Sequence, residues 1–340
     1  MKIDAVRFEV LPDWECCPAA AAYQHEDVAA VACDSHDRVY LHTRNGDRVS
    51  VYSEDGKFIG AWGDGVFNNA HGITIANDIV YATDNADSVV RKFDLEGNLL
   101  MTLGTPRVTS DTGYGKRRGP YQIHHNETVE RAAGPFNACC NTAIARNGDI
   151  FVADGYGNAR IHHFTPEGKL VNSWGEVGTG PGQFHLPHGL ALDHDENVIV
   201  CDRENDRLQF FDRNGRYLYM WTDVRRPTHA VVDEDGLIYV TELWRPLEAG
   251  QGSFVHGYAD CDLPGRVTVF RKDGKIVARF GDDSERRAAP GNFIAPHGIA
   301  LDSRGNLYVS EVSGTFGARA GRMSWELTRN HQIQKFVRVG

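Results

Sequence analysis

A pattern that recurs six times along the 340 residues constrains the fold of this chain more than any other feature. Each copy contains a short apolar segment after a polar turn, and in most copies the segment ends in an acid, as in Phe151–Asp154. Five copies also contain a glycine turn followed by a second apolar segment, such as Gly168–Trp174. Several short strands in a unit of about 40 to 50 residues are typical of propeller blades and not of helical solenoids. We therefore predict an all-β fold, a six-bladed β-propeller.

Both ends of the chain are predicted strands that complete the ring. Ile3–Leu11 has no earlier partner, and Gln332–Val339 has no outer strand after it. Because an open edge exposes unpaired backbone groups, we expect the N-terminal strand to pair into the last blade and close the propeller. No linker rich in Ser or Pro divides the sequence, so we expect a single domain over residues 1–340. Insertions near 107–135 and 245–264 interrupt the repeat, and such loops usually cover one face.

Three histidines occupy the same position in alternate repeats. His71, His188 and His297 each begin the first strand of a unit, and each precedes a glycine. Alternate units of a six-membered ring are related by threefold symmetry, so the three imidazoles are expected to converge on the axis. Three neutral imidazoles that leave coordination positions open are typical of catalytic zinc. We predict a metal site that binds Zn²⁺, with Fe²⁺ as the second choice.

The other three repeats lack a histidine at the corresponding position, which we assign to Ala29, Asn141 and Thr228. His229 lies one residue farther along, and a shift of one residue on a strand turns a side chain to the other face. A His-Gly pair can also be structural, with the imidazole bonded to a neighbouring strand. Packing alone gives no reason to skip every second blade, so we favour metal binding.

Charge and cysteine content argue against several classes of protein. The formal net charge of −10 and the lack of a basic stripe argue against nucleic-acid binding. No apolar run approaches the ~20 residues of a membrane-spanning helix, and no signal-peptide pattern is present, so we expect no membrane association. Seven cysteines, an odd number with two adjacent pairs, form a poor disulfide framework. We expect free thiols and a cytoplasmic location.

One stretch of about fifty residues carries distinctive motifs in addition to the repeat spacing. Its motifs are Asp154-Gly155-Tyr156-Gly157-Asn158, Trp174-Gly175-Glu176, Pro181-Gly182-Gln183-Phe184, Pro187-His188 and Asp202-Arg203-Glu204-Asn205. This stretch resembles the catalytic core of the peptidyl-α-hydroxyglycine α-amidating lyases, which are six-bladed zinc propellers of NHL-type repeats. The resemblance implies an active-site tyrosine at Tyr156 and substrate-binding arginines at Arg203 and Arg44. It also implies that the zinc ligands are His71, His188 and His297.

Several positions depart from the pattern of that family. Secreted members carry two disulfides, and the corresponding residues here cannot form them; they are Ala138, Gly157, Ile199 and Phe210. The family's calcium site uses an acid after the last zinc histidine, where this chain has Gly298, which argues against structural Ca²⁺. Ala295 replaces a methionine, and the two insertions have no clear counterpart. The substrate pocket is therefore expected to differ.

The resemblance and the histidine pattern together predict a metal-dependent lyase. It would cleave the C–N bond of a small 2-hydroxy carboxylate, such as an N-acyl or ureido derivative of α-hydroxyglycine, to an amide and glyoxylate. Arg203 and Arg44 would bind the carboxylate, and Tyr156 would take the hydroxyl proton. Two alternatives stay open: a metal-dependent propeller hydrolase or hydratase that acts on another small polar substrate, and a non-enzymatic scaffold that binds proteins.

Overall fold

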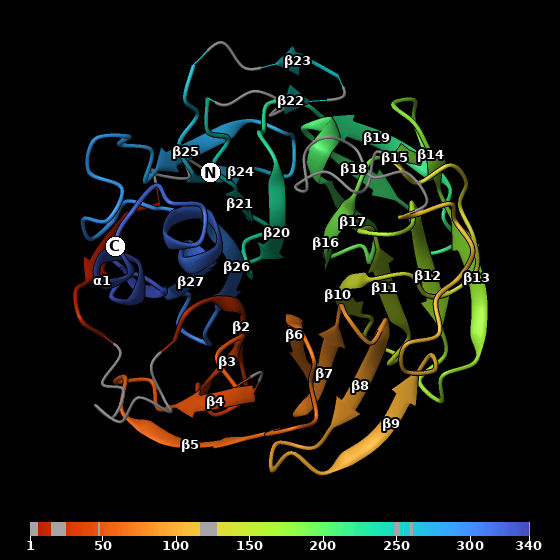
Figure 1. The fold of residues 1–340 in the computed structure, drawn as a ribbon, viewed down its shortest axis with the longest axis horizontal. Coiled ribbons are helices and arrows are strands. Elements are labelled where there is room, and N and C mark those ends of the chain that lie inside the picture. Colours follow the sequence, from red (N-terminus) through yellow and green to blue (C-terminus); the bar gives the residue numbers. More distant parts are fainter. Residues whose placement is uncertain are drawn as a thin grey trace.

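The computed structural model describes residues 6–14, 25–46, 48–115, 128–247, 252–253, 255–258 and 261–339. Within these residues, six four-stranded antiparallel sheets surround a central axis, with the first strand of each sheet nearest the axis (Figure 1). This arrangement confirms the predicted six-bladed β-propeller. No helix in the described part of the chain is long and apolar enough to cross a bilayer.

Blades 1 to 3 each use four consecutive strands, ordered from the axis outward. Blade 1 contains β2 (Val28–Cys33), β3 (Val39–Thr43), β4 (Arg48–Tyr52) and β5 (Phe58–Trp62). Blade 2 contains β6 (Ala70–Ala76), β7 (Ile79–Asp84), β8 (Val89–Phe93) and β9 (Leu99–Leu103). Blade 3 contains β10 (Cys139–Ile144), β11 (Ile150–Asp154), β12 (Arg160–Phe164) and β13 (Leu170–Trp174).

Blades 4 to 6 follow the same plan with additions. Blade 4 contains β16 (Pro187–Leu192), β17 (Val198–Asp202), β18 (Arg207–Phe211) and β19 (Tyr217–Trp221). Blade 5 contains β20 (Pro227–Val232), β21 (Ile238–Glu242), β24 (Arg266–Phe270) and β25 (Ile276–Phe280). Blade 6 contains β26 (Pro296–Leu301), β27 (Leu307–Glu311), β28 (Ile333–Arg338) and β1 (Phe8–Leu11).

The N-terminal strand closes the ring as predicted. Strand β1 pairs antiparallel with β28, from Phe8 opposite Arg338 to Leu11 opposite Lys335. Residues 3–5 of the expected segment lie outside the described residues. The last blade therefore combines both ends of the chain, and the strand that would otherwise form an open edge is paired.

Short elements connect or extend the blades. Strands β14 (Glu176–Val177) and β15 (Gln183–Phe184) form a parallel pair, and β22 (Gly252–Ser253) and β23 (Gly257–Tyr258) form a hairpin within the second predicted insertion. A short 3₁₀ helix, η3 (Arg203–Asn205), follows β17. A further interruption between β27 and β28 was not predicted, and it contains the π-helical turn η4 (Gly314–Ala318) and the helix α1 (Trp325–Arg329).

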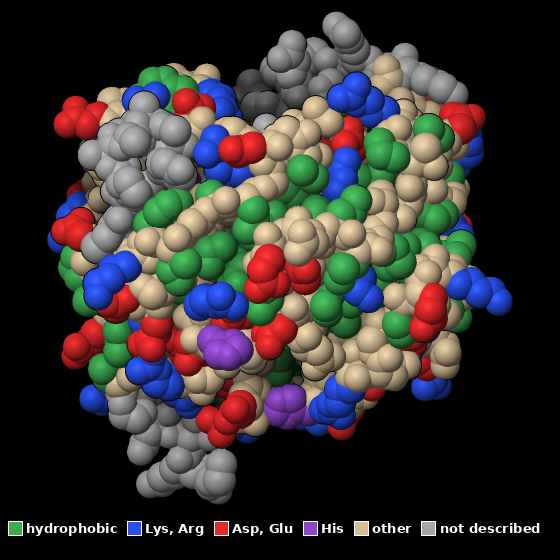
Figure 2. Space-filling view, turned by 90° about the horizontal axis from the view of Figure 1, so that it is seen from below, with side chains coloured by type: hydrophobic (Ala, Val, Ile, Leu, Met, Phe, Trp, Pro, Cys, Tyr) green, Lys and Arg blue, Asp and Glu red, His purple; other side chains and the backbone are tan. Residues whose placement is uncertain are grey.

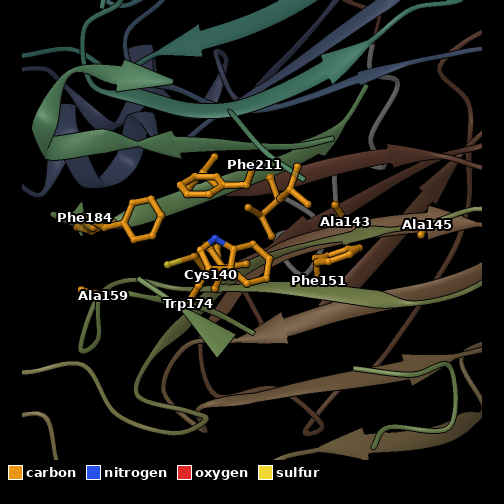
Figure 3. Close-up of a cluster of buried hydrophobic side chains, with 14 residues drawn as sticks. Cys140, Ala143, Ala145, Phe151, Ala159, Trp174, Phe184 and Phe211 are labelled. Atoms are coloured by element: carbon orange, nitrogen blue, oxygen red, sulfur yellow. The ribbon is translucent and has the colours of Figure 1, made fainter. Parts of the chain in front are cut away.

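The apolar core lies between neighbouring blades. Figure 3 shows the cluster between blades 3 and 4, where Trp174, Phe184 and Phe211 pack together. Trp174 also packs on the turn at Gly215, where an added Cβ would lie 2.6 Å from the indole ring. Gly215 has a φ of 83°, a conformation that glycine adopts without strain. This contact explains why a large apolar residue and a glycine turn recur together in the repeat.

The outer strands form the side wall of the ring. Ile59 of β5 and Leu99 and Leu100 of β9 are more than half exposed, at 54%, 56% and 51%. Figure 2 views this side and shows apolar side chains interspersed with charged ones. The first strands, in contrast, are largely buried because each packs against its neighbours around the axis. The residues at the start of those strands therefore hold fixed positions around the axis.

Candidate functional site

Each first strand carries a β-bulge at its start, and in three blades the bulge lies at a predicted metal ligand. In β16, Pro187 pairs with Asp202 and Gly189 pairs with Cys201, so His188 is the extra residue. His297 is the extra residue of β26 in the same way, and the corresponding irregularity in β6 includes His71. A bulge re-aims a side chain, and here it turns the imidazole out of the strand alternation.

The bulged residues of the other three blades are Ala29, Cys140 and Thr228. The assignment of Asn141 was wrong by one residue, because Cys139 pairs with Asp154 and Asn141 pairs with Ala153. Blade 3 has cysteine at position 139, where blades 4, 5 and 6 have a proline. His229 lies one residue beyond the bulge, opposite Thr241, as predicted.

The three bulged histidines meet on the axis. The nitrogen atoms that they offer lie within 4.8 Å of one another, and their ring centroids are 4.7 to 5.0 Å apart. All three side chains are buried. The structure therefore brings His71, His188 and His297 into one cluster that could hold a metal ion.

The second nitrogen of each imidazole faces a backbone carbonyl of the next blade. The Nδ1 atom of His71 lies 2.7 Å from the Cys140 oxygen, and those of His188 and His297 lie 2.6 Å from the oxygens of Thr228 and Ala29. A carbonyl only accepts, so Nδ1 carries the hydrogen and Nε2 is left as a metal donor. Burial, followed by the neighbouring imidazole of His297, holds the pKa of His71 and His188 well below the usual range. The residues present thus fit a metal bound by three neutral imidazoles.

The glycine after each histidine permits this approach between blades. A Cβ added at Gly189 would lie 2.3 Å from the Thr228 carbonyl oxygen, and one added at Gly72 would lie 2.5 Å from that of Cys140. Real side chains do not tolerate such distances without displacing the carbonyl. The His-Gly pair is therefore one unit, in which the histidine donates a hydrogen bond and the glycine makes room for its acceptor.

Tyr156 lies in the loop after β11 and points toward the histidines. Its hydroxyl oxygen is 3.1 Å from His71 Nε2 and 3.2 Å from His188 Nε2. Arg203 donates a hydrogen bond to the same oxygen from Nη1, at 3.1 Å. The hydroxyl therefore adjoins both the Nε2 atoms of the histidine cluster and a fixed positive charge, which suits a group that takes up and returns a proton.

Arg203 lies in η3, directly after the second strand of blade 4, and its side chain is buried. Its Nε donates to Glu204 Oε1 at 2.7 Å, and the same carboxylate oxygen accepts from Arg226 Nη2 at 2.9 Å. Glu204 and Arg226 are also buried, so one carboxylate orients two guanidinium groups away from water. Because first and second strands are antiparallel, Arg203 and His188 lie on the same rim.

Arg44 occupies the corresponding place in blade 1. Its Nε donates to the carbonyl of Ala70, the residue before His71, at 3.2 Å, and its Nη1 lies 3.5 Å from Asp27 Oδ2. Burial is the main cause of the low pKa of His71 and His297, and the positive charges of Arg44 and Arg203 lower it further. The two arginines and Tyr156 thus surround the histidine cluster, and this environment favours an anionic ligand.

Two parts of the site were not predicted. Thr112 Oγ1 in the first insertion donates to the Gly157 carbonyl at 2.5 Å, so a hydrogen bond connects the insertion to the loop that carries Tyr156. Burial, and then the nearby Tyr156, raises the pKa of Tyr114. Thr315 of η4 lies 3.5 Å from Arg44 Nη1. Neither contact follows from a repeat position, so no pattern in the sequence marks these residues.

Comparison with known proteins agrees with the repeat architecture. The NHL repeat family matches residues 184–211, which include His188 and Arg203. The chain is 31% identical over 297 residues to human NHL repeat-containing protein 3, a match that covers 78% of this chain and 80% of that protein. It is 35% identical over 173 residues to a probable peptidyl-α-hydroxyglycine α-amidating lyase of Caenorhabditis elegans, covering 49% of this chain and 43% of the relative.

Among solved structures, a streptogramin B lyase superposes with a TM-score of 0.56 at 12% sequence identity, and the match covers 98% of each chain. Identity at this level shows a common fold and no more. The matched segment spans less than half the length of the C. elegans relative.

Proposed function

Because the chain belongs to the family of NHL-repeat propellers related to the peptidyl-α-hydroxyglycine α-amidating lyases, we propose that it is a metal-dependent lyase. Its substrate would be a small 2-hydroxy carboxylate with a nitrogen leaving group, such as N-acyl- or ureido-α-hydroxyglycine. The observation that carries this proposal is the position of the Tyr156 hydroxyl, 3.1 Å from His71 Nε2 and within hydrogen-bond distance of Arg203.

Zinc is the metal we favour, with Fe²⁺ as the second choice, because three imidazoles suit either ion. When bound, the metal supplies a Lewis acid that lowers the pKa of a hydroxyl group at the site. We do not propose a structural Ca²⁺. An acid in place of Gly298 would have no room, since a Cβ there would lie 2.5 Å from Ser310 Oγ and 2.8 Å from the Ala30 Cα.

Three side chains, Arg203, Arg44 and Tyr156, would bind the substrate and transfer its proton. Arg203 and Arg44 would bind the substrate carboxylate, and this would orient the hydroxyl toward Tyr156. Tyr156 would act as the phenolate, paired with Arg203, and would remove the hydroxyl proton. As the carbon–oxygen double bond of glyoxylate forms, the C–N bond breaks and its electron pair leaves with nitrogen. The nitrogen then takes the proton back from Tyr156, so the products are an amide and glyoxylate and no other reactant is consumed.

A protein-binding scaffold is the second candidate, since the human relative is named for its repeats alone. The site argues for the enzyme, because a scaffold has no use for a tyrosine hydroxyl and a buried arginine beside three converging imidazoles. A hydrolase or hydratase would use the same residues with water as a reactant. The products formed from one substrate separate these reactions.

We further propose that the protein acts on a small anion in a reducing, cytoplasmic compartment. Cys139, Cys140 and Cys201 are buried free thiols, and burial raises the pKa of each. Protonated, buried thiols of this kind are stable where glutathione keeps cysteines reduced.

The direct test is to incubate the zinc-loaded protein with ureidoglycolate and with an N-acyl-α-hydroxyglycine and to measure glyoxylate and the released amide. The proposal predicts equal amounts of both products and no release by the His188→Ala variant. Release of ammonia or a carboxylic acid in place of the amide would favour a hydrolase. No turnover of any 2-hydroxy carboxylate would favour the scaffold.

A further inference from the structure

Two adjacent residues of η4, Thr315 and Phe316, connect to the two arginines that lie beside the histidine cluster. Arg44 belongs to blade 1 and Arg203 follows the second strand of blade 4, and these blades face each other across the ring (Figure 1). The η4 turn itself follows β27 of blade 6. A single turn of the chain thus contacts residues that interact with each of the two arginines.

The contact with Arg44 is partly direct, since Arg44 Nη1 donates to Thr315 Oγ1 at 3.5 Å, and partly through a shared carboxylate. Thr315 donates to Asp27 from its backbone nitrogen at 2.9 Å and from its hydroxyl at 2.5 Å. Asp27 is fully buried, and its Oδ2 also lies 3.0 Å from Arg319 Nη1. The same oxygen lies 3.5 Å from Arg44 Nη1, which is a long ion pair. Thr315 and Arg319 therefore engage much of the charge of Asp27 and leave the Arg44 guanidinium available to a ligand.

Glycine is needed for this approach. A Cβ added at Gly314 would lie 2.0 Å from the carbonyl oxygen of Glu26, the residue before Asp27. The turn is therefore packed directly against the start of blade 1. Its Thr315 hydroxyl is fixed by backbone contact as well as by its own hydrogen bonds.

The contact with Arg203 passes through a second arginine. The guanidinium carbon of Arg226 lies 5.8 Å from the centroid of the Phe316 ring, within the range of a cation–π interaction. Arg226 donates to Glu204 Oε1, and the same oxygen accepts from Arg203 Nε. Phe316 also packs against a buried apolar cluster that includes Leu243 and Ile294. Its aromatic face thus supports the ion-paired group that orients Arg203.

We propose that η4 is a positioning element that sets the separation between the Arg44 and Arg203 guanidinium groups, so that the site selects a compact ligand with one carboxylate next to its hydroxyl-bearing carbon. Thr315 acts through Asp27, and Phe316 acts through Arg226 and Glu204. This inference rests on the proposed function, since it assumes that both arginines bind the substrate carboxylate.

Glycolate, the simplest 2-hydroxy carboxylate, is the probe, and its binding to the zinc-loaded protein is measured by titration calorimetry. Thr315→Val keeps the shape of the side chain but removes the hydroxyl, so Asp27 pairs more closely with Arg44. We expect glycolate to bind about tenfold more weakly to this variant. Zinc content should be unchanged. Thr315→Ser restores the hydroxyl and should bring the Kd back to within about twofold of the original value.

Two further variants complete the experiment. Thr165→Val removes a hydroxyl that accepts a hydrogen bond from the Lys169 backbone nitrogen in an outer hairpin turn, and it should leave glycolate affinity unchanged. Phe316→Leu keeps an apolar side chain in the cluster but removes the aromatic face next to Arg226. We expect it to weaken glycolate binding about threefold. The Phe316→Leu measurement still tests the inference if the Thr315→Val variant does not fold.

The outcomes separate this inference from the proposed function. If the unaltered protein binds glycolate but Thr315→Val and Phe316→Leu bind it equally well, η4 does not position the arginines and the inference is wrong, while the lyase proposal stands. If the unaltered zinc-loaded protein does not bind glycolate, the proposed function and the inference are both contradicted. A loss in Thr315→Val that Thr315→Ser does not reverse would also count against the inference, because a general packing defect would then explain it.

Discussion

The Nδ1 atom of His188 lies 2.6 Å from the carbonyl oxygen of Thr228, the bulged residue of the next blade. The same relationship joins His71 to Cys140 and His297 to Ala29. Alternate blades therefore have different tasks: one supplies an imidazole, and the next supplies the carbonyl that orients it. This division explains why histidine occupies every second blade. Hydrogen bonds that fix the tautomer of a ligating histidine strengthen metal binding.

Replacing Gly189 by alanine should weaken metal binding without touching a ligand. The new Cβ would lie 2.3 Å from the Thr228 oxygen, so the acceptor of His188 must move. We expect zinc affinity to fall about 10- to 100-fold, measured by competition with a chelator. Gly60→Ala is the matched control, because nothing lies within 4 Å of a Cβ at that position. Equal zinc affinity for Gly189→Ala and the unaltered protein would show that the carbonyl contact is unimportant.

The Tyr156→Phe variant should bind zinc normally but lose turnover. Removing the hydroxyl takes away the group 3.1 Å from both His71 Nε2 and Arg203 Nη1 but no metal donor. A general base contributes about 10²- to 10⁴-fold to a rate, so kcat for glyoxylate release should fall by roughly that factor. Steady-state kinetics beside metal analysis tests this directly. A variant with full activity would remove the tyrosine from the mechanism.

The Glu204→Gln variant should lower stability, because Arg203 and Arg226 would lose the buried carboxylate that they share. Breaking a buried ion pair on one side costs about 3 to 5 kcal/mol in free energy of unfolding. Urea denaturation gives this quantity, with the exposed Glu167→Gln as the control, for which a change near zero is expected. Similar stability of the two variants would mean that water or another group satisfies the arginines.

The repeat allowed the six-bladed ring to be predicted from the sequence. The contacts between distant blades could not be predicted in this way. Five of the six repeats contain a glycine turn before the outer strand, and in blade 4 this turn, at Gly215, packs against Trp174, so the packing leaves a period that the sequence shows. The start of blade 3 was misplaced by one residue, because Asn141 was assigned as the bulged residue, which is Cys140. The hydrogen bond between Thr315 and Asp27 joins residues 288 positions apart, and no repeat pattern encodes it.

Histidine burial should make the fold sensitive to acid. Burial lowers the pKa of His42 to about 3, whereas a histidine in the unfolded chain titrates near 6.5. As the pH falls below ~6.5, the unfolded chain gains a proton that folded His42 does not, so stability present at neutral pH is lost toward pH ~3. Between about pH 7 and pH 5, this linkage lowers the free energy of unfolding by about 2 kcal/mol.

The His42→Gln variant removes this titration and isolates its effect. Urea denaturation at both pH values should show that the unaltered protein loses about 2 kcal/mol more than the variant over this range. If both proteins lose the same amount, His42 is protonated in the folded state or its environment opens in acid.

The measurement that tests the central claim most directly is the metal content of the purified protein beside two single variants, His188→Ala and His229→Ala. Both remove a buried histidine from a first strand, but only His188 lies at the bulge and in the three-histidine cluster. The account predicts about one zinc or iron per chain in the unaltered protein and in His229→Ala, and loss of that metal in His188→Ala. No bound transition metal in protein purified without chelators, or metal retained equally by both variants, would contradict it.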